Sequence, residues 1–384
     1  MPSGPQSKIC NDRIGIHTKG RGGGVKVALS LVEEVLEHNR EQSALFSSRE
    51  ARDEREDYRT KHSTEIGVLK CMDGRMSLAV FTETPLGIIQ PFRDLGARFE
   101  FGSPHFDHVM KRWVYRARRK NRCVIPLVCD HWSQGDRGRC CKGHGYDTAK
   151  ARAYASELRD RFAWHFAEHH PFVYPIHIRI ETDEDALTFY GARDGNDLNL
   201  SQTPTTTPAS VIDLRLREMY PDMREEMLLD LVPLVMGNLR HVAKMREQPR
   251  RPEDMQHREQ VFALGRDFDW MRRSNWAVIV GPYSMDIAAS IKTGAELILE
   301  NLREGRIAPS EGVVLMTSGI YKKRDLTSQR FAESRSRRLE HIATSIIRAQ
   351  VPKLGPYVTV LPGVTDMKTR RFTPLDGGAY RLIA

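Results

Sequence analysis

The chain lacks any hydrophobic run long enough to cross a membrane, and it is poor in cysteine. No apolar stretch approaches the ~20 residues that a membrane-spanning helix needs. Residues 1–24 are polar and glycine-rich, without the apolar core of a secretory signal. Six cysteines in 384 residues do not form a disulfide scaffold. We therefore expect a cytoplasmic protein whose thiols serve metal binding or catalysis.

The composition indicates a globular protein with a basic charge balance. Apolar residues make up 40% and charged residues 28% of the chain, so a sizeable core can form. The length is sufficient for two domains. A net charge of +9 permits an anionic partner. The basic residues are spread along the chain without a compact aromatic-basic signature, so nucleic acid is not expected as a partner.

The first half of the chain reads as alternating strands and helices. Residues 1–60 are expected to be a disordered basic segment followed by a helical arm, with an amphipathic pattern over 25–39 and a charged helix or linker over 47–61. Residues 61–200 would then form one domain, because alternating strands and helices favour a parallel sheet with crossovers. Its expected strands are 66–69, 86–92, 123–129 and a hairpin over 172–190, with helices at 106–118 and, capped by Thr148, at 148–166.

The last third resembles a degenerate repeat of this series of strands and helices. A linker at 195–209 and helices over 201–258 precede it, and residues 259–384 would form the second copy. Strands are expected at 276–280 and 312–316, helices at 287–304 and 331–349, and a hairpin over 357–372. This copy contains no cysteine, and Thr317 to Gly319 stand where the first copy has His131. The alternative is an unrelated α/β domain.

Metal-binding side chains of two types, thiol and imidazole, follow the ends of two expected strands. Cys71 follows the first strand, His131 follows the strand at 123–129, and Cys140 and Cys141 come soon afterwards. The carboxyl ends of parallel strands are where open α/β sheets place their active sites. Two thiolates and one imidazole are ligands that zinc favours, and three protein ligands leave a fourth position for water. We predict Cys71, His131 and Cys141 as ligands, with Cys140 as the alternative.

A carboxylate and a guanidinium follow Cys71 at short spacing. Asp73 and Arg75 lie two and four residues beyond Cys71, where Arg75 could hold Asp73 by charge-assisted hydrogen bonds while Asp73 orients the water. The alternative is a surface ion pair contributing about 0–1 kcal/mol. Arg93 and Gly96 are expected to shape a loop beside the site.

These motifs together resemble those of the β-class carbonic anhydrases. The resemblance covers residues 60–192 directly and 260–384 as a degenerate copy, and it rests on Cys71-Met72-Asp73-Gly74-Arg75, Arg93-Asp94-Leu95-Gly96, and His131 with a following cysteine. In architecture the chain is similar to the carboxysome shell branch of that class. Nine residues separate His131 from Cys141, where the family usually has His-x-x-Cys, and Asp94 replaces the usual asparagine. Residues 1–60 are too short for the long helical N-terminal domain of the shell branch.

The resemblance implies a fold, a cofactor and an activity. The fold would be α/β, a mixed sheet with crossover helices, duplicated as an active half and a degenerate half that replaces a partner subunit. Zinc would support the reversible hydration of CO₂ to bicarbonate, with an Asp73–Arg75 dyad and an inactive state in which Asp73 becomes the fourth ligand. Homo-oligomers would be dimers of such pseudo-dimers, with carboxysome or Rubisco association left open.

The same residues are also consistent with other metals and other functions. Cadmium or cobalt could replace zinc, and the candidates for a proton shuttle are His105, His108 and His144 by residue type alone. The same ligands could instead belong to a non-catalytic zinc module that binds RNA or a protein partner. A hydrolase of CS₂ or COS on the same fold is a further alternative.

Overall fold

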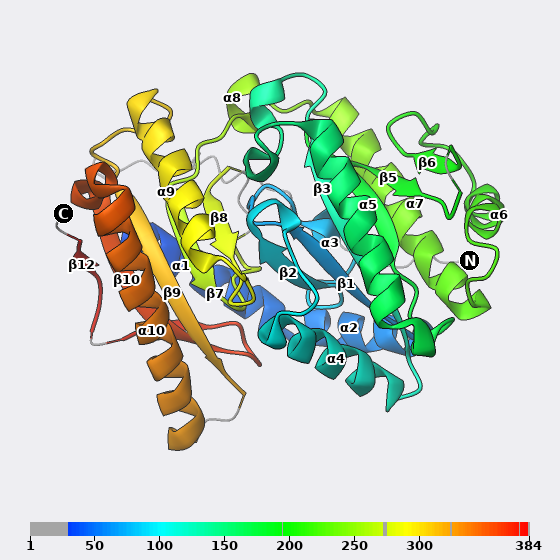
Figure 1. Cartoon of the computed structure of the whole chain (residues 1–384), viewed down its shortest axis with the longest axis horizontal. Helices are drawn as coiled ribbons and strands as arrows, with labels where there is room; N and C mark the ends of the chain where they lie inside the picture. The colour runs from blue at the N-terminus through cyan, green and yellow to red at the C-terminus, as the bar shows by residue number, and fades with distance from the viewer. Residues whose placement is uncertain (1–29, 194, 272–274, 323–324, 376, 383–384) are drawn as a thin grey trace, which may run out of the picture.

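The computed structural model describes residues 30–193, 195–271, 275–322, 325–375 and 377–382, and Figure 1 shows two sheets lying side by side. The strands of the first sheet are, in spatial order, β2 (Gln90–Asp94), β1 (Thr64–Cys71), β3 (Cys123–Trp132), β4 (Ile176–Glu181), β5 (Ala186–Tyr190) and β6 (Asp197–Asn199). The first four run parallel, and β5 and β6 add antiparallel.

The second sheet repeats this order of strands. Its strands are, in spatial order, β8 (Ala277–Val280), β7 (Val261–Gly265), β9 (Val313–Tyr321), β10 (Val358–Asp366) and β11 (Phe372–Pro374), and β12 (Tyr380–Arg381) also pairs with β10. The first four run parallel, and β11 adds antiparallel. In both sheets the second strand of the series lies at one edge, followed by the first, third, fourth and fifth. The predicted fold class, an α/β protein whose mixed sheet with crossover helices occurs twice, is confirmed.

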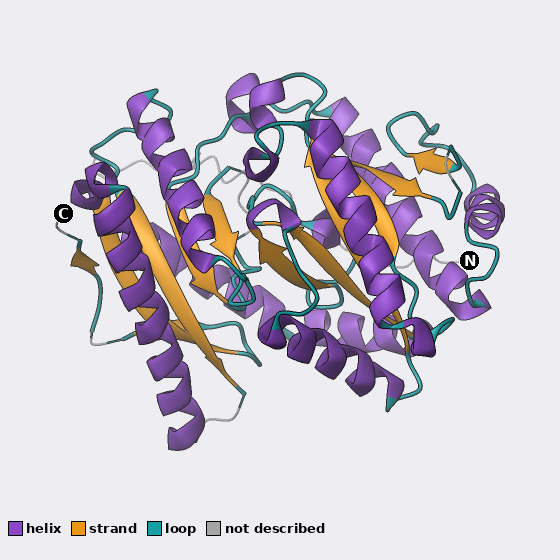
Figure 2. Cartoon of the chain, in the orientation of Figure 1, coloured by secondary structure: helices purple, strands orange, loops and turns teal. Residues whose placement is uncertain are grey.

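Helices cover both faces of the first sheet (Figure 2). The strands are buried on both sides, so neighbouring residues enter different cores. Leu69 and Val128 pack with α4 (Pro104–Arg118) and α5 (Thr148–His165), while Val68 and Leu127 face the core of α7 (Glu225–Glu247). The short helices α3 (Leu78–Phe81), α6 (Ala209–Met219) and α8 (Pro252–Met255) complete this part of the chain.

The N-terminal helices connect the two halves. One face of the second sheet packs with α9 (Ile287–Arg303) and α10 (Leu326–Gln350), and the other packs with α1 (Leu31–Ser47). The Asn39 side chain donates to the Arg370 carbonyl at 3.0 Å and accepts from the Phe372 amide at 2.9 Å. Helix α2 (Arg49–Lys61) returns to the first half, where Arg59 donates to the Gly87 carbonyl at 3.4 Å.

Several expected element boundaries were wrong. The strand expected over 86–92 begins only at Gln90, and β3 continues through His131 to Trp132. The side chain of Asp147, rather than Thr148, caps α5 by accepting from two amides. The expectations for residues 1–24, and the start of the amphipathic pattern at 25–29, lie outside the described residues.

Three strands lie where the sequence predicted none, and the expected helical linker packs in the core. No strand was expected at β7 or β12, and the region of β6 was expected to be a linker. Within α7, Leu231 and Val235 are fully buried, and Asn238 donates to the Phe81 and Asp185 carbonyls at 3.1 and 2.9 Å. Helix α7 therefore packs in one core with the first sheet.

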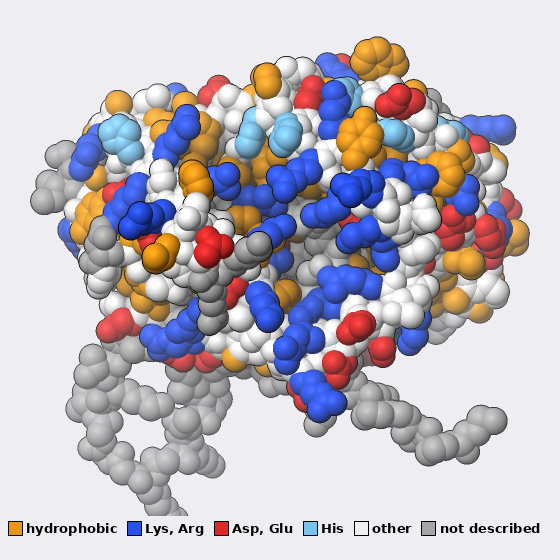
Figure 3. Space-filling view, turned by 90° about the horizontal axis from the view of Figure 1, so that it is seen from below, with side chains coloured by type: hydrophobic (Ala, Val, Ile, Leu, Met, Phe, Trp, Pro, Cys, Tyr) orange, Lys and Arg blue, Asp and Glu red, His pale blue; other side chains and the backbone are white. Residues whose placement is uncertain are grey.

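The surface is polar and charged. Figure 3 shows one face on which Lys and Arg side chains are spread widely, with smaller groups of Asp and Glu, in keeping with the net charge of +9. In the part of the chain that the structure describes, no helix is both long and apolar enough to span a membrane.

Candidate metal centre

The side chains of Cys71, His131 and Cys141 converge at the carboxyl end of the first sheet. Cys71 is the last residue of β1, and β3 runs parallel beside it, with Leu69 paired to Val128. This register brings His131 level with the end of β1. The ligand atoms of the three residues lie within 4.8 Å of one another, and the two Sγ atoms are 3.8 Å apart. All three side chains are buried.

Glycines hold the loop that delivers Cys141. Cys141 precedes a 3₁₀ turn over Lys142–His144, and a Cβ on Gly143 would lie 2.6 Å from the Gly96 amide nitrogen. Gly96 itself has a φ of 61°, a conformation that favours glycine. The His144 ring bonds the Gly96 carbonyl, Nε2 to O, at 2.8 Å. The loop is thus fixed against Gly96, in the turn that follows β2.

Cys140 faces away from this group. Its Sγ lies 3.5 Å from the Ser133 amide and 3.8 Å from the Ser133 carbonyl, within hydrogen-bonding range of both. Cys129 donates to the Asp130 carbonyl at 3.3 Å, and burial raises the pKa of its thiol. The geometry therefore favours Cys141 over Cys140 as a ligand, and Cys129 belongs to the hydrophobic core.

The donor set fits a thiophilic cation. Both ring nitrogens of His131 are buried without a hydrogen-bond partner among the described residues. A buried polar group without a partner is costly, and ligation would satisfy one of these nitrogens. The Cys141 thiol donates to the Cys71 sulfur, and this hydrogen bond lowers the pKa of Cys71 and raises that of Cys141. A metal ion would bind both as thiolates, and zinc suits this set of ligands.

Asp73 and Arg75 form a buried ion pair beside the three ligands. Arg75 Nη2 donates to Asp73 Oδ2 at 2.6 Å, Nε lies 3.1 Å from both carboxylate oxygens, and the Arg75 amide donates to Oδ1 at 2.9 Å. Burial alone would raise the pKa of Asp73, but the Arg75 charge outweighs it and holds that pKa well below its ordinary value. Asp73 is therefore a carboxylate, and the surface interpretation of this pair is wrong.

The segment that follows α8 touches this pair, although nothing in the sequence predicted its role. Arg75 Nη1 donates to the Met255 carbonyl at 3.2 Å, and Nη2 lies 3.4 Å from His257 Nε2. His257 Nδ1 in turn lies 2.8 Å from Glu259 Oε1. His257 stands 182 positions from Arg75 along the chain. Its spacing from Glu259 offers no recognisable motif, so no signal in the sequence pointed to it.

The histidines considered for proton transfer lie in different environments. His105 and His108 are exposed on α4, and the His105 ring lies 5.6 Å from that of Tyr283. His144 is buried, and its ring is held by the Gly96 carbonyl. Arg93 donates to the Asp73 carbonyl at 3.2 Å, so it supports the turn that carries the acid–base pair.

Comparisons with known proteins give little beyond this geometry. No family model matches the chain, and no curated protein matches it. Among solved structures, the chain is similar to the β-carbonic anhydrase CcaA. The two are 16% identical with a TM-score of 0.30, over 41% of this chain and 92% of that one. A TM-score this low does not establish a functional relationship between the two proteins.

Proposed function

We propose that the protein is a zinc-dependent carbonic anhydrase, a lyase that reversibly hydrates CO₂ to bicarbonate. The observation that carries the proposal is the convergence of Cys71, His131 and Cys141 beside a buried acid–base pair. Three ligands of this type leave one position open on a tetrahedral ion, as catalytic zinc sites do. Asp73 and Arg75 are the proposed catalytic residues.

The proposed chemistry divides between the ion and the chain. When bound, Zn²⁺ would lower the pKa of a water from about 15.7 to roughly 7. Asp73 would accept a hydrogen bond from the attacking water and so aim a lone pair of its oxygen at CO₂. Arg75 would keep Asp73 ionised and correctly turned, because it binds both carboxylate oxygens. The buried walls would limit the access of bulk water.

A closed structural zinc site fits the geometry less well. Such a site needs a fourth protein ligand, and Cys140, its expected donor, faces Ser133. We therefore consider a non-catalytic zinc module, with RNA or a protein as its partner, a weaker proposal than the enzyme. A hydrolase of CS₂ or COS would use the same ligands, and the assay below separates it.

We further propose that the second half is a repeat that has lost its ligands. If Glu181 and Asp366, the last residues of β4 and β10, are equated, the strand pairing aligns Trp132 with Tyr321 and Leu69 with Leu264. Counting along these strands places Arg266 at the position of Cys71, and places Ile320, rather than the expected Thr317 to Gly319, at that of His131. The proposed domains are thus a catalytic one over 61–200 and a ligand-free one over 259–384.

Metal content and activity test the proposal together. Purified protein should contain one zinc per chain and hydrate CO₂ in a stopped-flow assay under reducing, alkaline conditions. Cys71→Ala should lose both the zinc and the activity, whereas the matched variant Cys140→Ala should keep both. Zinc without CO₂ hydration would contradict the proposal, and assays with COS and CS₂ under the same conditions would then test the hydrolase.

A further inference from the structure

The segment between α8 and β7 places a buried histidine–glutamate pair against the site. Glu259 has no solvent exposure and His257 has 8%. The Asn301 side chain, from α9, donates to the Glu259 carbonyl at 3.0 Å and to Oε2 at 3.3 Å. Asn301 thus fixes the Glu259 carboxylate, and the other carboxylate oxygen, Oε1, lies 2.8 Å from His257 Nδ1. This pair belongs to neither candidate metal ligands nor the acid–base pair.

The Glu259 carboxylate and the Arg75 guanidinium lie on opposite sides of the His257 ring. His257 Nδ1 is 2.8 Å from Glu259 Oε1, and Nε2 is 3.4 Å from Arg75 Nη2. The contact with Arg75 is long, because both hydrogens of Nη2 are already donated to Asp73 and to the Arg139 carbonyl. Glu259 thus orients the imidazole so that the ring packs against the guanidinium. Carboxylates orient the histidines of metal sites in the same way.

Arg75 is held from several directions at once. Its Nη1 donates to the Met255 carbonyl, and its Nη2 donates to the Arg139 carbonyl at 2.8 Å as well as to Asp73. The weaker contact with His257 closes the remaining side. Since Asp73 uses both oxygens on Arg75, its carboxylate can turn toward the three metal ligands only if Arg75 also moves.

A second cation site is a poorer interpretation of the same cluster. Ligand atoms of Asp73, His257 and Glu259 lie within 4.8 Å of one another. The Arg75 guanidinium, however, already lies between Asp73 and His257 and supplies a fixed positive charge there. A divalent ion in this place would be repelled by that charge.

We propose that His257, oriented by Glu259, is a positioning residue for the metal site and makes this site depend on the segment between α8 and β7. It holds Arg75 in place, and Arg75 retains Asp73 as a hydrogen-bond acceptor and prevents it from becoming the fourth ligand. This inference rests on the proposed function for its role in turnover. Its structural content concerns only where Asp73 lies, and that can be measured without turnover.

The test uses the full-length protein loaded with Co²⁺, whose visible absorption reports the ligands of the ion. His257→Ala should shift the Co²⁺ bands, because a carboxylate replaces water, and should lower kcat of the zinc form about 10-fold with little change in KM. Glu259→Gln should shift both in the same direction but less. Arg258→Ala is the matched control, since this neighbouring side chain is exposed and donates to the Arg306 carbonyl.

A double variant isolates the pathway through Asp73. The Co²⁺ spectrum of His257→Ala combined with Asp73→Asn should equal that of Asp73→Asn alone, since an amide does not replace the carboxylate as a ligand. His257→Gln, which keeps a polar group in place if the alanine variant folds poorly, should lie between wild type and alanine. An unchanged Co²⁺ spectrum in a folded His257→Ala or His257→Gln protein would overturn the inference. If wild type binds metal without hydrating CO₂, the proposed function fails, while the spectra still decide whether His257 positions Asp73.

Discussion

Asp73 shows how much depends on one charged side chain in this protein. It is buried, ionised and bound to Arg75 through both carboxylate oxygens. The pair could be predicted from the sequence because its two members follow Cys71 at fixed short spacing. Their burial could not, because it comes from Met255 and Arg139, which reach the pair from distant parts of the chain.

Removing the acid should destabilise the fold. Asp73→Ala leaves Arg75 buried without its counter-charge, and breaking such a pair costs about 3–5 kcal/mol. Urea unfolding of the metal-free protein should show a loss of this order. Asp53→Ala is the control, because that side chain is 65% exposed on α2 and should change stability by less than about 0.5 kcal/mol. Equal stability of the Asp73→Ala and wild-type proteins would contradict the buried pair.

Asp94 should make stability fall as the pH rises. Burial raises its pKa to about 6, and its Oδ1 accepts from the Leu95 amide and the Ser290 hydroxyl, each at 2.8 Å. Between the ordinary pKa of about 4 and this value the folded state binds more protons than the unfolded one, so stability declines through that window. Asp94→Asn keeps the Oδ1 acceptor and should remove the decline.

Unfolding free energies at two pH values test this expectation. Near pH 4 the Asp94→Asn and wild-type proteins should be similar, and at pH 8 the variant should be more stable by up to about 3 kcal/mol. Asp53→Asn, on an exposed helix, should show no such difference. A variant less stable than wild type at pH 8 would mean that ionised Asp94 is favourable in the fold.

At the scale of elements, most helices and strands follow from local patterns, and the misses have physical causes. The run that forms β7 is short and apolar, and periodicity alone cannot assign such a run. The three-residue β6 lies among prolines and threonines that signal a loop, and it forms only because β5 offers a free edge. His131 was expected just after its strand, but pairing with β4 extends β3 through it.

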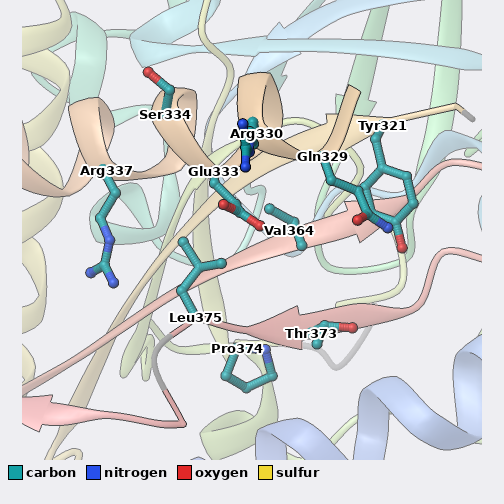
Figure 4. Close-up of a pocket in the computed structure, with 10 residues that line it drawn as sticks. All are labelled: Tyr321, Gln329, Arg330, Glu333, Ser334, Arg337, Val364, Thr373, Pro374 and Leu375. Atoms are coloured by element: carbon teal, nitrogen blue, oxygen red, sulfur yellow. The ribbon is translucent and has the colours of Figure 1, made fainter. Parts of the chain in front are cut away.

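Close contact between α10 and β9 gives an element-scale prediction. A Cβ on Gly319 would lie 1.9 Å from the Ala332 carbonyl oxygen, so Gly319→Ala must push α10 away from the sheet. Overpacking of this kind costs about 1–3 kcal/mol, measurable by thermal or urea unfolding. Ser334→Ala, on the exposed side of α10 where the helix lines an open groove (Figure 4), should be nearly neutral. A neutral Gly319→Ala would contradict the packing.

At the scale of the whole molecule, the two sheets meet edge to edge beside the site. The Ile279 amide donates to the Met72 carbonyl at 2.8 Å, and the Gly281 amide donates to the Arg93 carbonyl at 2.9 Å. The sequence suggested two similar halves, but their relative position could not be predicted from it, because the contacts between them involve backbone groups that every residue carries. For the same reason, the contribution of both sheets to the surroundings of the site could not be predicted.

The junction itself can be tested at Gly74. A Cβ there would lie 2.0 Å from the Ala277 carbonyl oxygen, so Gly74→Ala should separate β8 from the turn that carries the acid–base pair. We expect lower stability and a faster loss of zinc to a chelator. Gly138→Ala, in an exposed loop where the nearest atom is a movable Asp136 oxygen at 3.2 Å, should change neither. Retention of zinc at the wild-type rate by Gly74→Ala would contradict a role for the junction.

The buried support of Arg75 by Met255, His257 and Glu259 has a genetic consequence. A random mutagenesis screen for lost activity should recover changes in this stretch alongside changes at Cys71 and His131, although it supplies none of the predicted ligands. A few positions in this segment, which binds no metal itself, would then be as intolerant of substitution as the ligand positions.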